Sequence, residues 1–314
     1  MIFSNKTKKT GDLKMGKQVI VKVPASTANL GPGFDVLGMA LNLYNTVVLE
    51  EMESDCQIIE VKGEGESLLP RDSSNLAARA VSSLLYSAGY SDHGFKLCLE
   101  NQIPLASGLG SSAAAIVGGL VAANALAESP FSDQDILQMA VEIEGHPDNV
   151  AAALLGGVVV VIKDEESCIY SRLIPREGLG ITAVIPDFSI STAEARSVLP
   201  EYVPLQDAVY NLGRIALLVT ALREGDWDLL RVALHDRLHQ PYRCQLVPGL
   251  ADVFAAALES GAYGAFLSGA GPTVVALTPP DCDAGRAIAD VFQSKNITAR
   301  VLQLEPCLTG SYIL

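Results

Sequence analysis

The alternation of apolar and polar positions along the chain predicts strands interleaved with helices. Residues 19–23 form a short β-branched run, and residues 156–162 form a nearly continuous one of the kind found in buried strands. Residues 113–127 carry no charge and are rich in Ala, which predicts a buried helix. Strands that share a sheet with interleaved helices indicate an α+β fold.

The same reasoning predicts the remaining elements. We interpret the runs at 41–52 and 57–62 as paired strands, and we expect Ser73 or Ser74 to cap the helix that follows. Further strands are expected at 95–99, 181–185, 265–268, 274–278 and 298–304, and further helices at 75–88, 132–145, 192–199, 205–224, 226–238, 250–260 and 284–293.

The length of 314 residues is enough for two domains, since domains of roughly 100 to 150 residues are the commonest. A charged, polar stretch at 163–167 is the expected boundary between them. We therefore predict a flexible N-terminal extension at 1–16, an N-terminal domain at 17–166 and a C-terminal domain at 167–314.

Charge and composition narrow the class of partner. The net charge of −14 and the pI near 4.7 argue against nucleic acid, which is bound by clustered Lys and Arg. The apolar run at 113–127 is too short for a membrane span, and the Lys-rich start lacks the apolar core of a secretory signal. Dispersed cysteines without a C-x-x-C pair indicate reduced thiols. We expect a cytoplasmic protein that binds neither nucleic acid nor membrane.

The stretch 104–115, PLASGLGSSAAA, has the composition of a phosphate-binding loop. Gly108 and Gly110 remove side chains that would keep the backbone away from an anion, and Ser111 and Ser112 supply hydroxyls where a helix begins. The free N–H groups and the positive dipole end of that helix would attract phosphate. Since no Lys follows the last glycine, the loop is not of the G-x-x-x-x-G-K-[ST] type, and its cation must come from elsewhere.

Two further glycine-containing loops flank this stretch, PASTANLGPGFDVLG at 24–38 and LSGAGPT at 267–273. Three such loops in this order resemble the GHMP kinases, the small-molecule kinases named for galactose, homoserine, mevalonate and phosphomevalonate. The first loop, together with GHPDNV at 145–150, STAEAR at 191–196 and QPYR at 240–243, is similar to the motifs of the homoserine kinases within that family. The resemblance covers the chain from about residue 18 to its end.

The resemblance implies a two-domain GHMP kinase fold. Its N-terminal domain would be of the ribosomal-protein-S5-domain-2-like type, and its C-terminal domain would be a ferredoxin-like α/β plait. It also implies the activity, which is ATP-dependent phosphorylation of the side-chain hydroxyl of L-homoserine to O-phospho-L-homoserine, a step in threonine biosynthesis. The enzyme would use Mg²⁺ and form a homodimer.

The family further implies where ATP binds. Asn75 would contribute to the adenine pocket, although the plain role of a helix cap stays equally open. The phosphates would lie on Pro104, Leu105, Ala106, Ser107, Gly108, Leu109, Gly110, Ser111, Ser112, Ala113 and Ala114.

For the metal, the family implies that Ser112 and Glu142 hold Mg²⁺, with Ser111 as the less favoured hydroxyl and Glu144 as the alternative carboxylate. A hydroxyl and one carboxylate suffice, because Mg²⁺ keeps several waters and binds substrate phosphates. His235 and His239 have metal-like spacing but no acidic or Cys partner at ligand spacing, so we interpret them as solvated or core histidines.

For the amino acid, the family places Asn29, Asp35 and His146 near the amino and hydroxyl ends of the substrate, and Arg196 and Arg243 near its carboxylate. This agrees with the chemistry, since the planar fork of Arg can bind a carboxylate through two hydrogen bonds and Asp pairs with an ammonium.

His146, Asp148 and Asn149 are the expected catalytic residues. Asp148 stands where related kinases have an aspartate base, and Asn149 beside it could orient the hydroxyl. Positioning of the substrates and neutralisation of their charge are expected to contribute most of the rate enhancement, because phosphoryl transfer makes little demand on a base.

Two other functions stay open. Another GHMP kinase could act on a polyol or an isoprenoid precursor, but such a substrate would not require both Arg196 and Arg243 with Asp35. A non-catalytic nucleotide-fold binding protein is disfavoured by the acidic charge and by the presence of Ser112 and Glu142.

Overall fold

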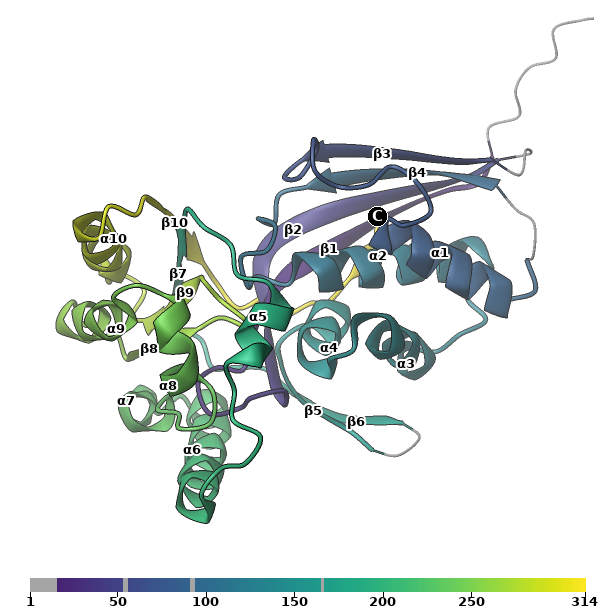
Figure 1. Cartoon of the computed structure of the whole chain (residues 1–314). Coiled ribbons are helices and arrows are strands. Elements are labelled where there is room, and N and C mark those ends of the chain that lie inside the picture. Colours follow the sequence, from purple (N-terminus) through teal and green to yellow (C-terminus); the bar gives the residue numbers. More distant parts are fainter. Residues whose placement is uncertain (1–15, 53–55, 91–93, 165–166) are drawn as a thin grey trace, which may run out of the picture.

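The computed structural model describes residues 16–52, 56–90, 94–164 and 167–314, and these residues form two sheets with their helices (Figure 1). The predicted α+β class is thereby confirmed. Of the predicted extension at 1–16, residues 1–15 lie outside the described part of the chain. In that described part, none of the helices combines the length and apolar character that a membrane crossing needs.

The first sheet has the order β11-β1-β2-β4-β3, and β5 joins it by pairing with both β2 and β6. Its strands are β1 (Gln18–Ala28), β2 (Leu37–Met52), β3 (Gln57–Gly63), β4 (Gly94–Asn101), β5 (Val158–Lys163), β6 (Cys168–Leu173) and β11 (Tyr312–Ile313). The expected pairing of the runs at 41–52 and 57–62 is wrong, because β4 lies between β2 and β3. β3 and β4 are parallel, an arrangement that requires a crossover connection, here through a helix.

One face of this sheet is covered by α1 (Leu76–Ser87), α2 (Ser111–Leu126), α3 (Asp133–Glu144) and α4 (Pro147–Leu155), as Figure 1 shows. Asn75, rather than Ser73 or Ser74, caps α1, since its side chain accepts the N–H groups of Ala77 and Ala78. The uncharged helix α2 packs against β1 and β2. Helix–sheet contact on this face builds the main hydrophobic core.

The second sheet is antiparallel, with the order β10-β7-β9-β8. Its strands are β7 (Gly180–Pro186), β8 (Gly264–Leu267), β9 (Val274–Thr278) and β10 (Ala299–Leu304). This order is that of the predicted ferredoxin-like plait. In β9, Val274 and Ala276 face one core cluster while Val275 and Leu277 face the other, so both faces of the sheet are covered.

The C-terminal half also carries short helical segments, which bring functional loops together. The expected helix at 226–238 is divided into two short helical segments, and residues 234–239 form a non-helical connection to the next helix. The helices are α5 (Thr192–Ser197), α6 (Leu205–Glu224), η1 (Trp227–Leu229), α7 (Leu230–Ala233), α8 (Gln240–Arg243), η2 (Cys244–Leu246), α9 (Leu250–Glu259) and α10 (Ala284–Ser294).

The chain crosses between the sheets more than once. β6 pairs with β5, so the predicted boundary after residue 166 falls within the β5–β6 hairpin and the first sheet continues to Leu173. The charged stretch at 163–167 begins at Lys163, the last residue of β5, and ends just before β6, and its residues 165–166 lie outside the described part of the chain. At the C-terminus, β11 returns to pair with β1 of the first sheet.

The three glycine-containing loops meet where the two sheets adjoin. Ser268 of the third loop places its hydroxyl 2.7 Å from that of Thr27 and donates to the Gly108 carbonyl at 2.6 Å. The Thr273 N–H donates to the Ser107 carbonyl at 3.1 Å. The backbone approach is so close that a Cβ on Gly108, whose φ is +91°, would lie 2.2 Å from the Ser268 carbonyl oxygen.

This approach yields a first prediction, for Gly108→Ala compared with Gly89→Ala. Gly89 has a similar φ of +86°, but no described atom lies within 4 Å of its added Cβ. Both variants incur the left-handed backbone cost of about 1–2 kcal/mol. Gly108→Ala should lose a further 1–3 kcal/mol or so through the clash. Urea denaturation measures both free energies of unfolding, and equal losses would contradict the assignment.

Candidate active site

The N-terminus of α2 has the geometry expected of an anion-binding site. The helix begins after Gly110, whose φ is 72°, and no side chain from the described residues caps it. A Cβ on Gly110 would lie 2.1 Å from Oγ of Ser26, and this Oγ donates to Oδ1 of Asn149 at 2.9 Å. The first N–H groups of α2 are thus available to a phosphate at the positive end of the helix dipole.

A cavity of about 420 Å³ adjoins this helix start. Its walls are largely apolar and include Leu69, Pro70, Leu76, Leu99, Leu105 and Ala115. Asn75 lines it as well, but its amide is engaged: Oδ1 accepts from the N–H groups of Ala77 and Ala78, and Nδ2 donates to the Pro70 carbonyl at 2.9 Å. Asn75 therefore caps α1 and shapes the cavity at the same time.

Ser112 meets Glu144 rather than Glu142. The Ser112 hydroxyl donates to Oε2 of Glu144 at 2.5 Å, whereas the exposed Glu142 accepts from Nε2 of Gln138. The expected pairing of Ser112 with Glu142 is not formed, because residues two apart on α3 point in different directions. Burial raises the pKa of Glu144, and the Ser112 hydrogen bond partly opposes this.

These oxygens suit Mg²⁺, which takes few protein ligands and otherwise water and phosphate. Within the described residues, no group of three or more His, Cys, Asp or Glu side chains gathers as a metal cage. A hydroxyl and one carboxylate beside the uncapped start of α2 match the smaller donor set that Mg²⁺ uses at nucleotide sites.

Asp148 is 3% exposed and lies in the first turn of α4. Burial, with a further contribution from the negative charge of Asp35, raises the pKa of Asp148 to about 7, while the N–H of Asn149 works in the opposite direction. A Cβ on Gly38 would lie 2.1 Å from the Asp148 carbonyl oxygen, so glycine lets α4 approach β2. The sequence motif thus places a carboxyl that titrates near neutrality.

His146 precedes α4 and is half-buried. Burial and the positive charge of Arg196 lower its pKa, while Asp35 opposes the shift. Its imidazole is therefore neutral at pH 7 and faces the same charges as Asp148.

Asp35 and Arg196 form an ion pair across the two domains. Nη2 of Arg196 donates to both carboxylate oxygens, at 2.7 and 2.9 Å. Nε of Arg196 is buried and has no hydrogen-bond partner among the described residues. Asn29 supports the loop, since its Oδ1 accepts the Asp35 N–H at 3.0 Å and its Nδ2 donates to the Gly269 carbonyl at 2.9 Å.

Arg243 is 2% exposed and lies beside this pair. Its Nε donates to the Ala195 carbonyl and its Nη1 to the Gly269 carbonyl. Burial and the neighbouring charge of Arg196 lower the pKa of Arg243 to about 10. Two guanidinium groups held together in this way favour an anion between them.

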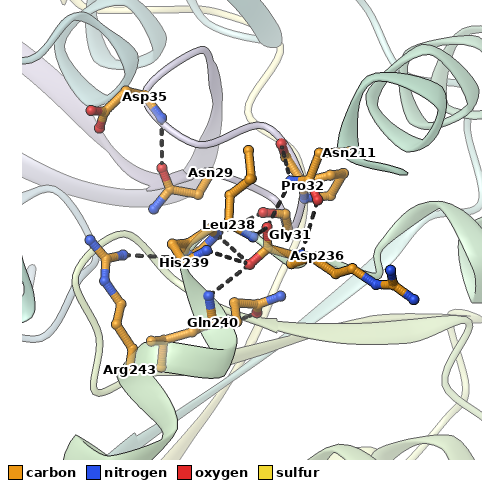
Figure 2. Close-up of polar contacts among 12 residues, drawn as sticks. Asn29, Gly31, Pro32, Asp35, Asn211, Asp236, Leu238, His239, Gln240 and Arg243 are labelled. Atoms are coloured by element: carbon orange, nitrogen blue, oxygen red, sulfur yellow. Dashed lines mark hydrogen bonds and ion pairs between the residues drawn. The ribbon is translucent and has the colours of Figure 1, made fainter. Parts of the chain in front are cut away.

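Sequence reasoning missed Phe34 and the segment before α8. Phe34 lies within about 5.4 Å of both the Arg196 and the Arg243 guanidinium carbons, measured from its ring centroid. His239 is a core histidine, as predicted, but it also hydrogen-bonds to Arg243 (Figure 2). Its position next to the QPYR motif was the available signal.

The two sheets, the open start of α2 and the Ser112–Glu144 pair define the class of protein, a small-molecule kinase of the GHMP type. The family described as GHMP kinases N terminal domain matches residues 75–157, and GHMP kinases C terminal matches residues 218–297.

The chain is 46% identical over 296 residues to a homoserine kinase of Moorella thermoacetica, covering 94% of this chain and 99% of that protein. The crystal structure of homoserine kinase from Cytophaga hutchinsonii is similar with a TM-score of 0.86 at 31% identity, covering 99% of this chain and 100% of that one. Mevalonate kinase of Methanococcus jannaschii shares the fold, with a TM-score of 0.68 at 16% identity over 93% of this chain and 99% of that one. This chain belongs to the homoserine kinases of the GHMP kinase family.

The raised pKa of Asp148 yields a second prediction. An aspartate with a pKa of about 7 when folded and about 3.9 when unfolded binds its proton more tightly in the folded state. It therefore destabilises the folded protein progressively as the pH rises from about 4 to 7. Asp148→Asn should raise the free energy of unfolding by roughly 2–4 kcal/mol at pH 8 and change it little at pH 4.

Urea denaturation at both pH values measures this effect. Asp281→Asn, at an exposed position, is the matched control and should give no gain that depends on pH. An equal gain for Asp148→Asn at pH 4 and pH 8 would mean that the buried carboxyl is not its cause.

Proposed function

We propose that this chain transfers the γ-phosphoryl group of ATP to the side-chain hydroxyl of L-homoserine, giving O-phospho-L-homoserine and ADP for threonine biosynthesis. The observation that carries the proposal is the Asp35–Arg196 pair beside the α2 loop, with Arg243 next to it. The names of relatives that are 46% and 45% identical over nearly the whole chain support the same substrate.

An amino-acid zwitterion can take the place of the internal ion pair. Its ammonium would bind Asp35, and its carboxylate would bind Arg196, whose buried Nε is a free donor within the described structure. Arg243 would add a second positive charge. A neutral polyol offers neither charge, and a mevalonate-like acid offers only one, so the pocket suits an amino acid best.

ATP would lie with its phosphates on 104–114 at the start of α2 and its base in the adjoining cavity of about 420 Å³. Ser112 and Glu144 would hold Mg²⁺, in place of the predicted Ser112 and Glu142. When bound, the metal supplies the positive charge that the loop lacks and neutralises phosphate oxygens.

In the reaction, the homoserine hydroxyl oxygen bonds to the γ-phosphorus as the bond to the β–γ bridging oxygen breaks. The hydroxyl proton is lost late in such a loose transition state. We assign Asp148 as the residue that would accept it, and this role is supported by its pKa of about 7, which suits proton exchange near neutrality. Asn149, which Ser26 fixes, and the neutral His146 would orient the hydroxyl.

The proposal includes a cytoplasmic location and a homodimer. The exposed side of α6 carries an apolar stripe of Leu205, Val209 and Leu212, which are 79%, 57% and 66% exposed. Spacing of three and four residues puts these side chains on one helix face, which a second copy of the chain would cover.

The substrate assignment is tested by ADP release with Mg-ATP and, in turn, L-homoserine, mevalonate and galactose. Homoserine should be the preferred acceptor, and ³¹P NMR should identify its O-phosphate. Arg196→Ala should raise KM for homoserine by about 10- to 100-fold, since a charged hydrogen bond contributes about 1.5–3 kcal/mol. Preference for mevalonate or galactose would favour another GHMP kinase, and no turnover at all would favour a binding protein.

The metal assignment is tested with Glu144→Gln and its matched control Glu142→Gln, two residues away on the same helix. We expect Glu144→Gln to lower kcat by about 100-fold or more, because it removes the negative ligand beside Ser112. Glu142→Gln should stay within about twofold, as expected for an exposed side chain. Titration of Mg²⁺ at saturating ATP measures kcat for both variants. A larger loss of kcat in Glu142→Gln than in Glu144→Gln would show that Glu142 is the metal ligand.

A further inference from the structure

The segment 236–243 is held in a fixed shape by the buried side chain of Asp236. Its Oδ1 accepts the Leu238 N–H at 2.8 Å and Nδ2 of Asn211 at 2.7 Å. Its Oδ2 accepts the N–H groups of His239 and Gln240, at 3.0 and 2.7 Å. The carboxylate thereby fixes the start of α8 and ties it to α6 (Figure 2).

The hydrogen bonds of His239 define which of its ring nitrogens carries the proton. Nη1 of Arg243 lies 3.2 Å from Nδ1, and since a guanidinium can only donate, Nδ1 accepts. Nε2 therefore carries the hydrogen and donates to the Gly31 carbonyl at 2.7 Å. The side chain is fully buried and burial lowers its pKa, so the ring stays neutral.

Through these bonds the imidazole links the first loop to Arg243. Its ring stacks on Phe34, with centroids 5.1 Å apart and an interplanar angle of 23°. A Cβ on Gly31 would lie 2.3 Å from the Leu234 carbonyl oxygen, so the loop rests directly on the segment before α8. The loop that carries Asp35 and the guanidinium of Arg243 therefore share one support.

We infer that His239 is a positioning residue for recognition of the substrate carboxylate. It does not contact substrate in this role; its Nδ1 fixes the plane of the Arg243 guanidinium, and its Nε2–H fixes the loop at Gly31. The identification of this carboxylate as that of homoserine rests on the proposed function. The role itself follows from the hydrogen bonds at both ring nitrogens.

The kinetic test compares His239→Leu with His239→Asn, whose side-chain oxygen can replace Nδ1 as an acceptor. His239→Leu should raise KM for L-homoserine about tenfold or more, because the charged donor of Arg243 loses its acceptor. His239→Asn should recover most of that loss, and KM for ATP should stay within about twofold in both. His235→Leu, at an exposed position directly before this segment, is the matched control and should leave all constants unchanged.

A substrate without a carboxylate separates positioning from general damage. 3-Aminopropan-1-ol keeps the amine and hydroxyl of homoserine but has no group for Arg243. If His239 acts through Arg243, His239→Leu should lower kcat/KM for homoserine by about tenfold and leave kcat/KM for this amino alcohol within about twofold. An equal loss on both substrates, or no change in KM for homoserine, would overturn the inference.

The ¹⁵N NMR spectrum of the free wild-type enzyme gives a readout that needs no substrate. We expect His239 to be neutral with its proton on Nε2, and the Arg243 side-chain signals to shift in His239→Leu. A proton on Nδ1 would overturn the inference whatever the activity. If the spectra agree but homoserine is not phosphorylated, the proposed function fails while the positioning of Arg243 by His239 stands.

Discussion

The carbonyl oxygen of Gly269 is the acceptor on which the arrangement of the site depends. It receives Nδ2 of Asn29 at 2.9 Å and Nη1 of Arg243 at 2.8 Å, both buried donors. Asn29 belongs to the loop after β1, and Arg243 belongs to α8, so one backbone group joins both domains to the third glycine-containing loop. A buried donor without an acceptor costs about 1–3 kcal/mol of stability. Displacing this loop would therefore leave the Asn29 and Arg243 donors without their shared acceptor at the same time.

Around this acceptor the protein keeps features that do not favour stability. Asn29, Asp35 and Ala106 have positive φ values of 71°, 59° and 48°, which are costly for residues other than glycine. Asp148 is buried with a pKa of about 7, and Arg243 is buried with a pKa of about 10. All of them lie in the loops and at the helix ends that the proposed reaction uses. The regular helices and sheets beneath these loops supply the stability that offsets such costs.

Local patterns in the sequence predicted most of the helices and strands and the three glycine-containing loops, but they did not predict α4, β6 or β11, and they predicted one helix at 226–238 where the structure has a divided one. Glycine spacing predicted the start of α2, and the motifs predicted the proximity of Asp35 and Arg196. Strand pairing was not accessible in the same way: the insertion of β4 between β2 and β3 depends on a crossover that no local pattern encodes. The polar stretch at 163–167 was interpreted as a domain boundary, because its composition does not reveal that the strands on either side of it, β5 and β6, pair with each other.

The proposed metal ligand and His239 show two different limits of prediction from sequence. Glu142 and Glu144 are equivalent in composition, and their roles depend on the direction in which each side chain leaves α3. His239 meets the Gly31 carbonyl across 208 positions of sequence, so its role depends on tertiary contacts alone. A lone histidine in a helical segment gives no sign of this unless its neighbour in the QPYR motif is already known to bind an anion.

The Asp35–Arg196 pair also explains how the site could select an amino acid before any chemistry occurs. Opening the pair exposes one negative and one positive group, each of which then needs a partner. A zwitterion satisfies both, so the interactions lost within the protein are regained with the ligand. A simple carboxylic acid would satisfy Arg196 and leave Asp35 unpaired, and an amine would do the reverse. Since an unpaired charge in a partly buried site is costly, the internal ion pair opposes every ligand that lacks either charge.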